Sequence, residues 1–428
     1  MKTAELRMIP VSELKPAAYN PRKKLKPGDK EYEKIKNSIE EFGFADPLVV
    51  NADMTIIGGH QRLNCAINMG YTEVPCAVVD VDKVREKALN IALNKITGAW
   101  DENLLAELLE DIQSSDFDLG KTGFDPPEID ELFNNVHNKD IKDDNFDVDA
   151  ELEKPCFSKP GDIWHLGRHT VICGDTTLPE TYSALLGDTK VNLVCTDAPY
   201  FVQLKNKSGT IANDDLDDKS AYEFLMKAFT NFKNAMAIDA SIYEFYATMK
   251  TRVFYDAFED AGFRVGAGLI WKKPRAPFMR TDWKFNMEPL IFGWRKDGKH
   301  NWYGDQKQTA VFEFDGIKDS GKEGFSHPSS KPVPLIAYLI QQSTMTNGVV
   351  LDGFLGSAST LIACEQLDRI CYGIELEPKF VDVAVMRFQK YTSENVKSAD
   401  VYVIRNGQKL TFDEALAEMP AEGGDANG

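Results

Sequence analysis

The fold is decided by one apolar strand that breaks into a glycine-containing turn: Val349-Val350-Leu351-Asp352-Gly353-Phe354-Leu355-Gly356-Ser357-Ala358-Ser359. Residues 360–367 continue it as a helix. At the carboxyl end of a parallel strand, such a turn lets backbone amides approach a ligand closely. About twenty residues further on, a second apolar strand ends in Glu375, which is placed to accept hydrogen bonds from ribose hydroxyls. This spacing fits a cofactor that contains a ribose, either a dinucleotide or S-adenosylmethionine.

The residues around this stretch extend the same pattern. From residue 163 onward, apolar runs alternate with helical periodicity, and the runs cover residues 191–196, 242–247, 269–271, 349–351 and 372–374. This alternation predicts an α/β fold with a doubly wound, Rossmann-like and mainly parallel sheet.

The chain is too long for a single typical core, so we expect at least two domains. Residues 134–155 are rich in aspartate and glutamate and poor in large apolar side chains, as in a solvated linker. We therefore predict a smaller α/β domain at 1–135, an acidic linker at 136–157 and the larger domain at 158–395. Residues 396–428 form a C-terminal extension with a disordered tail.

Composition excludes several kinds of protein. The net charge of −18 argues against a protein that coats nucleic acid by electrostatics alone, although it allows a local basic groove. Because there is neither a membrane-length apolar run nor a signal-peptide core, we expect a soluble cytoplasmic protein without a membrane partner. The seven cysteines never form a Cys-x-x-Cys pair, so we expect no metal site.

The tetrapeptide Asp197-Ala198-Pro199-Tyr200 follows the buried strand at 191–196, where doubly wound sheets bind ligands. The amino group of a nucleobase is a poor nucleophile, because its lone pair is delocalised into the ring, and it needs acceptors that orient both N–H bonds. Asp197 and the Ala198 carbonyl can supply them, Pro199 stiffens the turn, and Tyr200 offers a stacking face for an extruded base. Taken alone, the tetrapeptide is also compatible with an ordinary turn.

Further motifs reverse that judgement. Residues 164–391 resemble the circularly permuted, or β-class, amino-methyltransferases of DNA, whose catalytic motif precedes the cofactor loop. The matching motifs are Cys173-Gly174-Asp175, Asp197-Ala198-Pro199-Tyr200, His327-Pro328-Ser329-Ser330-Lys331-Pro332, Phe354-Leu355-Gly356-Ser357 and Gly373-Ile374-Glu375. The resemblance implies an S-adenosylmethionine-dependent DNA methyltransferase that holds its cofactor with Asp175, His327, Lys331, Asp352, Phe354, Gly356, Ser357 and Glu375.

Two positions depart from the usual motifs of this family. Ala198 replaces the first proline of Asp-Pro-Pro-Tyr and keeps the backbone carbonyl at the cost of rigidity. Ala358 replaces the second glycine of the cofactor loop, where it could hinder close approach to the cofactor. Aspartate at the head of the tetrapeptide resembles the adenine-specific members, which favours N6 of adenine over N4 of cytosine.

Residues 268–308 interleave basic and aromatic side chains in an otherwise acidic chain. Phosphate contacts and base-edge readout use these residue types. We therefore predict a region that faces double-stranded DNA, formed by Lys272, Lys273, Arg275, Arg280, Lys284, Arg295 and Lys296. The alternative is a solvated face with local hydrophobic packing.

Near the N-terminus, residues 56–66 read as a strand, a glycine turn and a helix start, and the motif is Gly59-His60-Gln61-Arg62. Amides at a helix start together with an arginine form a phosphate cradle. Residues 9–109 resemble the ParB/sulfiredoxin superfamily; His60 stands in place of the catalytic cysteine of the sulfiredoxin branch. The ParB branch binds nucleoside triphosphates and DNA, but its helix-turn-helix partner domain is not evident. A regulatory or DNA-engaging role follows.

Rival functions stay open at this point. One is a ParB-like regulatory or partition protein with a decayed methylase domain. Others are a cytosine-N4 methyltransferase and an amino-methyltransferase acting on RNA or on glutamine in protein. The sequence also leaves open a homodimer and an accompanying restriction nuclease.

Overall fold

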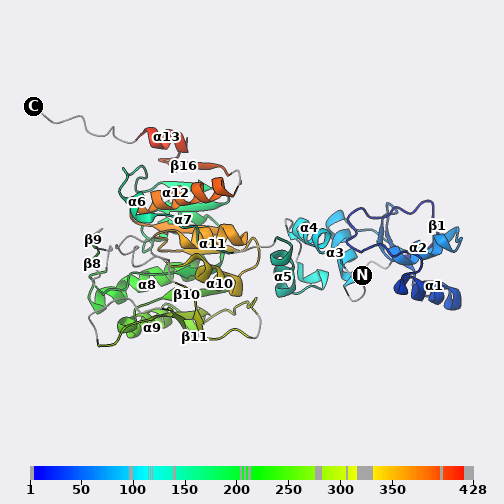
Figure 1. Ribbon diagram of the computed structural model, residues 1–428, viewed down its shortest axis with the longest axis horizontal. Helices are drawn as coiled ribbons and strands as arrows, with labels where there is room; N and C mark the ends of the chain where they lie inside the picture. Colours follow the sequence, from blue (N-terminus) through cyan, green and yellow to red (C-terminus); the bar gives the residue numbers. More distant parts are fainter. Residues whose placement is uncertain are drawn as a thin grey trace, which may run out of the picture. The chain divides into compact units, whose positions relative to one another are not determined.

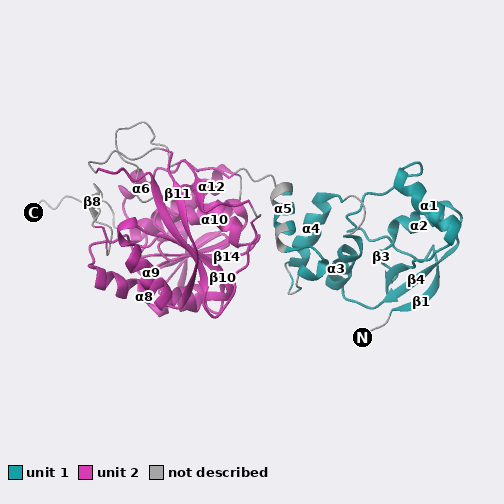
Figure 2. Ribbon diagram, turned by 90° about the horizontal axis from the view of Figure 1, so that it is seen from below, with its two compact units in different colours: residues 1–138 teal, residues 139–428 magenta. Residues whose placement is uncertain are grey.

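The computed structural model describes residues 4–95, 100–113, 115, 117, 119–137, 141–202, 205–206, 209–210, 214–274, 282–304, 307–315, 331–395 and 399–418. The chain divides into two compact units, residues 1–138 and residues 139–428 (Figure 2). None of the described helices combines the length and the hydropathy that crossing a bilayer requires.

The first unit contains a four-stranded sheet in the order β1-β4-β2-β3. Its strands are β1 (Glu5–Pro10), β2 (Leu48–Asn51), β3 (Ile56–Gly58) and β4 (Glu73–Val79). Its helices are α1 (Lys30–Phe42), α2 (His60–Asn68), α3 (Lys83–Asn94), α4 (Glu102–Gln113) and α5 (Pro126–His137), with a 3-10 turn at Leu119–Thr122. Leu48, Val50 and Ile56 alternate into its core.

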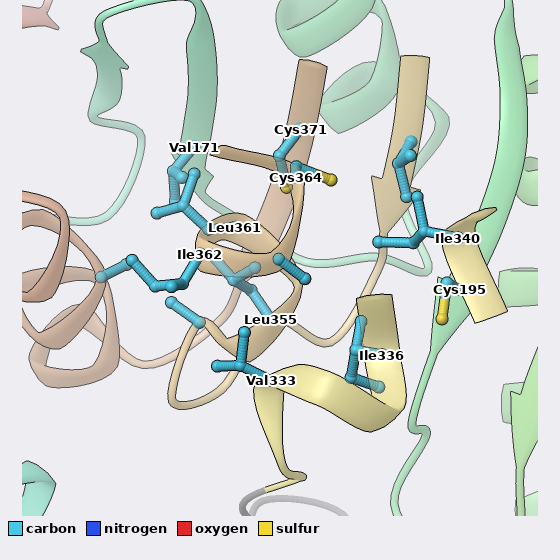
Figure 3. Close-up of a cluster of buried hydrophobic side chains, with 14 of the residues drawn as sticks. Val171, Cys195, Val333, Ile336, Ile340, Leu355, Leu361, Ile362, Cys364 and Cys371 are labelled. Atoms are coloured by element: carbon cyan, nitrogen blue, oxygen red, sulfur yellow. The ribbon is translucent and has the colours of Figure 1, made fainter. Parts of the chain in front are cut away.

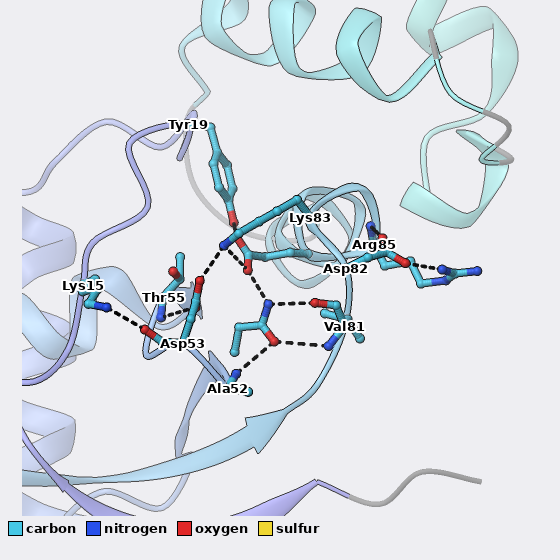
Figure 4. Close-up of polar contacts among 11 residues, drawn as sticks. Lys15, Tyr19, Ala52, Asp53, Thr55, Val81, Asp82, Lys83 and Arg85 are labelled. Atoms are coloured by element: carbon cyan, nitrogen blue, oxygen red, sulfur yellow. Dashed lines mark hydrogen bonds and ion pairs between the residues drawn. The ribbon is translucent and has the colours of Figure 1, made fainter.

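A buried carboxylate fixes α3 against this sheet, and two of the residues that bond to it, Tyr19 and Lys83, are labelled in Figure 4. Glu86 is fully buried and accepts hydrogen bonds from Tyr19 Oη at 2.8 Å, from Lys83 Nζ at 2.8 Å and from Asn51 Nδ2. Although burial raises it, these three donors hold the pKa of Glu86 below its ordinary value. Asn51 also bonds both backbone groups of Val81, so the loop before α3 is tied to β2.

The described residues of the second unit form an eleven-stranded sheet in the order β13-β11-β12-β10-β7-β14-β15-β6-β5-β16-β17. Figure 1 shows it running from β16 past β10 to β11. The strands are β5 (Ile163–Leu166), β6 (His169–Cys173), β7 (Val191–Thr196), β10 (Met236–Phe245), β11 (Phe263–Lys272), β12 (Met287–Arg295), β13 (Val311–Glu313), β14 (Val349–Asp352), β15 (Ile370–Glu375), β16 (Val401–Arg405) and β17 (Gln408–Thr411). Two short strands, β8 (Lys205–Asn206) and β9 (Gly209–Thr210), pair separately.

Strands β10, β7, β14, β15 and β6 are parallel to one another, which confirms the doubly wound core. The flanking strands β12 and β5 are antiparallel to their inner neighbours. At the outer edge beyond β12, β13 again pairs in parallel with β11. Helices cover both faces because successive strand residues point to opposite sides. Val194 packs with α7 (Pro179–Leu186), α8 (Asp218–Ala235) and α9 (Thr251–Asp260).

The other face is covered by α10 (Val333–Ser343), α11 (Ser359–Leu367) and α12 (Pro378–Glu394). Figure 3 shows Val333, Ile336 and Ile340 of α10 in one apolar cluster with Leu361 and Ile362 of α11. This packing holds the start of α10 and the start of α11, which both border the candidate site, in fixed positions.

The C-terminal extension is partly built into the second unit. Strands β16 and β17 continue the sheet beyond β5, and α13 (Phe412–Ala417) follows with a capping box at Thr411. Residues 419–428, predicted to be disordered, lie outside the described residues.

The acidic segment around residue 145 is anchored to the second unit. The side chain of Asp144 is 6% exposed and forms a two-pronged ion pair with Arg387 at 2.7 Å. Asp143 accepts a hydrogen bond from the Val333 amide at 2.8 Å. Arg387 also donates to the carbonyl of Ser357 at 2.6 Å. A short helix, α6 (Val148–Leu152), comes next. The interpretation of this stretch as a solvated linker is therefore wrong for Asp143 and Asp144, whose side chains attach it to Val333 and Arg387 of the second unit.

Candidate active site

The carboxyl ends of the parallel strands meet at one edge of the sheet. Asp197 follows β7, the cofactor loop follows β14, Glu375 ends β15, and Asp175 lies two residues after β6. Register supports this alignment, because Glu375 pairs with Cys173 and the Gly174 amide donates to the Glu375 carbonyl at 2.9 Å. The structure therefore brings the predicted catalytic turn and the described cofactor residues to the same edge.

Lys331 binds the predicted catalytic turn from a position just before α10. Its ammonium group donates to Asp197 Oδ2 at 2.5 Å and to Tyr200 Oη at 3.2 Å, and it lies 3.2 Å from Glu288 Oε2. The side chain is only 7% exposed, so these partners replace water. The resemblance placed Lys331 with the cofactor residues, whereas the structure pairs it with Asp197 and Tyr200.

Glu288 completes this network from β12. It accepts a hydrogen bond from Tyr200 Oη at 3.2 Å and pairs with Lys273 Nζ at 2.5 Å. Burial raises the pKa of Glu288, but Lys331 and Lys273 outweigh that effect and hold the pKa at about 2. Glu288 is thus ionised, and the Tyr200 ring is fixed by its hydroxyl group.

Asp197 presents one free oxygen. Its Oδ1 atom is buried and has no hydrogen-bond partner among the described residues, while Oδ2 is taken by Lys331. Burial raises the pKa of Asp197 and Lys331 opposes that rise. A buried acceptor without a partner is costly, so Oδ1 is poised to accept a hydrogen bond from a ligand.

The backbone of the turn is also held from β10. The Ala198 amide donates to Glu244 Oε1 at 3.1 Å, and both residues are buried. Glu244 lies inside the apolar run 242–245 and pairs with Thr196 in the sheet register.

Asp352 shapes the cofactor loop. Its carboxylate accepts from Thr196 Oγ1 at 2.7 Å, from Thr360 Oγ1 at 2.6 Å and from the Phe354 amide at 3.1 Å. Burial raises the pKa of Asp352 to about 6. Since Thr196 directly precedes Asp197, this carboxylate joins the cofactor loop to the catalytic turn.

Glu375 and the glycine turn fit a ribose-containing cofactor. Glu375 Oε2 accepts from the Gly356 amide at 2.8 Å, and Oε1 accepts from the Glu377 amide at 2.9 Å. Each carboxylate oxygen keeps a lone pair for a hydroxyl donor. Gly356 has a φ of +50°, and a Cβ atom there would meet only the Phe354 carbonyl, at 3.9 Å, so the turn leaves space beside Glu375. His327 lies outside the described residues.

Ala358 does not crowd this space. It adopts a left-handed conformation with a φ of +67° at the start of α11, which explains why a glycine is usual at this position. Its side chain is fully buried in the apolar cluster beneath the loop. Alanine at this position therefore carries a left-handed backbone conformation that glycine would adopt without strain.

The basic region is divided by the fold. Lys272, which pairs with Met287 where β11 ends, and Lys284, shortly before β12, are both exposed. Lys273 forms an ion pair with Glu288. The structure does not bring Arg295 and Lys296 to this edge, because they lie at the other end of β12. Arg275 and Arg280 lie outside the described residues.

The N-terminal motif forms a helix start as predicted. Gly59, with a φ of +93°, precedes α2, and Gln61 bonds the backbone of residues 23 and 25. Arg62 pairs with Asp46. Burial lowers the pKa of His60 to about 4, and His60 Nε2 and Arg62 Nε are buried without partners among the described residues.

Sequence reasoning missed Glu244 and Glu288 as site residues. Both are single carboxylates within apolar strands. Because a buried charge requires a partner, a carboxylate in such a strand is the sequence feature that could have indicated a site residue. Their partners at Ala198 and Lys331 are distant in sequence and could not be assigned.

Comparison with known proteins agrees with this geometry. The model of the DNA methylase family matches residues 191–386, and that of the ParB N-terminal domain matches residues 1–95. The ParB-methyltransferase HTH domain matches residues 103–160, so the inference that no helix-turn-helix is evident was wrong. Helices α4 and α5 carry mostly acidic polar residues, and charge therefore gave no sign of it.

Individual relatives match about half of this chain. The putative methylase YubD of Escherichia coli (strain K12) is 30% identical over 190 residues, which are 44% of this chain and 76% of that protein. The type II methyltransferase M2.MboI of Moraxella bovis is 24% identical over 229 residues, covering 48% of this chain and 83% of its own. The solved PvuII DNA methyltransferase (cytosine-N4-specific) is 16% identical with a TM-score of 0.43, covering 56% of this chain and 94% of its own. The chain belongs to the DNA methylase family, the S-adenosylmethionine-dependent enzymes that methylate N6 of adenine or N4 of cytosine in DNA.

Proposed function

We propose that this protein methylates N6 of adenine in double-stranded DNA, with Asp197-Ala198-Pro199-Tyr200 holding the extruded base. The observation that carries the proposal is the buried Asp197 Oδ1, an acceptor without a partner among the described residues, beside the cofactor loop. The aspartate at this position supports adenine, since the cytosine-N4 members of the resembling family commonly have serine there.

The residues of this chain act by orientation. Asp197 Oδ1 accepts one N–H of the target amino group, and the Ala198 carbonyl accepts the other. Tyr200, fixed through Glu288 and Lys331, provides the face against which the base stacks. Both acceptors draw electron density toward the nitrogen and favour its tetrahedral form. Bound S-adenosylmethionine supplies the electrophilic methyl group. Lys331 keeps Asp197 ionised through the reaction.

Glu375 and the turn at Gly356 would hold the ribose of the cofactor, while Phe354, Ser357 and Asp175 border the same edge. Lys272, at the end of β11, and Lys284, shortly before β12, are both exposed, and we assign them contacts with DNA phosphates.

The product decides the proposal. Incubation with labelled S-adenosylmethionine and double-stranded DNA, followed by digestion and mass spectrometry of the nucleosides, should yield N6-methyladenine. Detection of N4-methylcytosine alone would show that cytosine, and not adenine, is the target base. Label appearing only in RNA or protein controls would move the substrate to another class of macromolecule.

Glu375 makes cofactor binding pH-dependent. Burial raises the pKa of Glu375 to about 7, from 4.5, so the carboxyl is neutral in the folded protein below that pH. A raised folded pKa means that this group favours the fold at low pH and that its contribution is lost as pH rises from 4.5 through 7. Hydroxyl donors prefer the ionised form, so we expect the Kd for S-adenosylmethionine to rise by up to about tenfold per pH unit below 7.

Calorimetric titration between pH 5.5 and 8 measures this effect. Glu375→Gln should bind S-adenosylmethionine more weakly at pH 8, and its Kd should no longer rise steeply below pH 7. This comparison separates titration of Glu375 from titration of the ligand itself. Glu377→Gln, at an exposed neighbour, should retain this rise in Kd. An unchanged profile in Glu375→Gln would remove Glu375 from the cofactor site.

A second site is supported in the first unit. We infer that Gly59-His60-Gln61-Arg62 binds a nucleoside triphosphate, because His60 Nε2 and Arg62 Nε are buried and unpartnered at the start of α2 among the described residues. Binding of the four ribonucleoside triphosphates, measured by calorimetry, should be lost in Arg62→Ala. Equal affinity of the variant would contradict the assignment.

A further inference from the structure

The second residue of the catalytic turn has a hydrogen-bond donor that the usual motif lacks. Ala198 stands where the resembling family has proline, and proline has no backbone N–H. Ala198 is 1% exposed, so its N–H cannot reach water and needs a partner inside the protein.

Glu244 is that partner. It is fully buried at the end of β10, and its Oε1 atom accepts from the Ala198 amide at 3.1 Å. The other oxygen, Oε2, has no partner among the described residues. A carboxyl at this depth is costly, and its best-defined contact is the one to Ala198.

The surroundings favour the neutral acid. Burial raises the pKa of Glu244 well above its ordinary value, and the charges of Asp197 and Asp352 add to the rise, whereas the hydrogen bond from the Ala198 amide and the charge of Lys331 oppose it. A neutral carboxyl still accepts through its carbonyl oxygen, in the same way as the amide of glutamine. The role of Glu244 at Ala198 therefore requires an acceptor and not a negative charge.

We propose that Glu244 is a positioning residue that replaces, by one hydrogen bond, the rigidity that proline would give at position 198. It fixes the plane of the peptide between Asp197 and Ala198, and with it the direction of the turn that presents the Ala198 carbonyl. This inference rests on the proposed role of that carbonyl in orienting the target amino group.

Three substitutions and one double variant test it. Glu244→Leu removes the acceptor and leaves the Ala198 N–H unsatisfied, so kcat should fall by about 10- to 100-fold with little change in KM for S-adenosylmethionine. Glu244→Gln keeps the acceptor and should stay close to the wild-type rate. Ala198→Pro removes the donor, and in the Glu244→Leu background it should restore most of the lost kcat.

Thermal unfolding provides a readout that does not depend on activity. Glu244→Leu should lower the Tm by roughly 2–4 °C in the wild-type background. It should lower the Tm less, or not at all, when Ala198 is already proline, because no N–H is then left without a partner.

The outcomes separate the two ideas. Additive effects of Glu244→Leu and Ala198→Pro on Tm, or a loss of kcat in Glu244→Gln as large as in Glu244→Leu, would overturn the inference. If the Tm effects of the two substitutions are not additive but the protein methylates no nucleic acid, the hydrogen bond is supported and the proposed function is contradicted. Coupled Tm values with restored kcat in the double variant support both.

Discussion

Replacement of Asp197 by alanine is expected to lower methyl transfer by at least about 1000-fold while S-adenosylmethionine still binds. The substitution removes Oδ1, the acceptor proposed for the target amino group, and also the carboxylate that pairs with Lys331. The cofactor loop keeps its own support from Thr196 and Thr360 through Asp352. Single-turnover rates and calorimetric cofactor binding, measured on one preparation, should therefore diverge.

Asparagine at position 197 sharpens this test. Lys331 needs an acceptor, so the single carbonyl oxygen of the amide should turn toward it, leaving an NH2 group at the place of Oδ1. A donor facing a donor cannot orient the base, and Asp197→Asn should be nearly as impaired as Asp197→Ala. Asp188→Ala, at an exposed position before β7, is the matched control and should keep its activity. Turnover within tenfold of wild type in Asp197→Asn would contradict the role given to Oδ1.

Replacement of Lys331 by methionine is expected to reduce kcat by about 100-fold and to destabilise the second unit by about 3–5 kcal/mol. The variant leaves Asp197 and Glu288 close together without the ammonium group between them. Both carboxyl groups should then take up protons more readily, because burial and mutual repulsion disfavour their charged forms. A protonated Asp197 is a weaker acceptor for the amino group.

Loss of the Lys331 charge also determines the direction of the pH dependence. In Lys331→Met the folded-state pKa of both carboxyl groups rises above the unfolded value, so stability is lost as pH increases through that interval. The acid limb of kcat should move to higher pH, since Asp197 must ionise to act. Lys272→Met breaks only an exposed pair with Glu313 and should change stability by less than about 1 kcal/mol. An unshifted acid limb in Lys331→Met would show that Lys331 does not tune Asp197.

The sequence was sufficient for features that depend on local order. An apolar strand followed by Asp197, or by the glycine turn at Gly356, predicts both the element and the edge at which it ends, because parallel strands share that edge. The confirmed doubly wound core follows from the same alternation. The antiparallel flanks were not predicted, because pairing of β12 with β10 depends on contacts distant in the chain.

Other features depend on three-dimensional proximity. Glu288 and Lys331 meet only after β12 and α10 pack, and spacing along the chain gives no sign of it. Charge misled the interpretation twice. The basic character of Lys273 indicates contact with DNA, yet Lys273 neutralises Glu288. The acidic residues of α4 and α5 give no sign of the helix-turn-helix domain that matches there.

The Asp144–Arg387 pair has a consequence for any attempt to separate or exchange the two halves of this protein. A recombinant catalytic fragment that starts at the first strand of the sheet, Ile163, would lack the carboxylate and leave a buried guanidinium beside Ser357. A chimaera with a foreign recognition module should instead be joined before Ile141. A stable catalytic fragment must therefore begin well before the first strand of its sheet. The first residues that it needs lie in the acidic stretch whose composition resembles a linker.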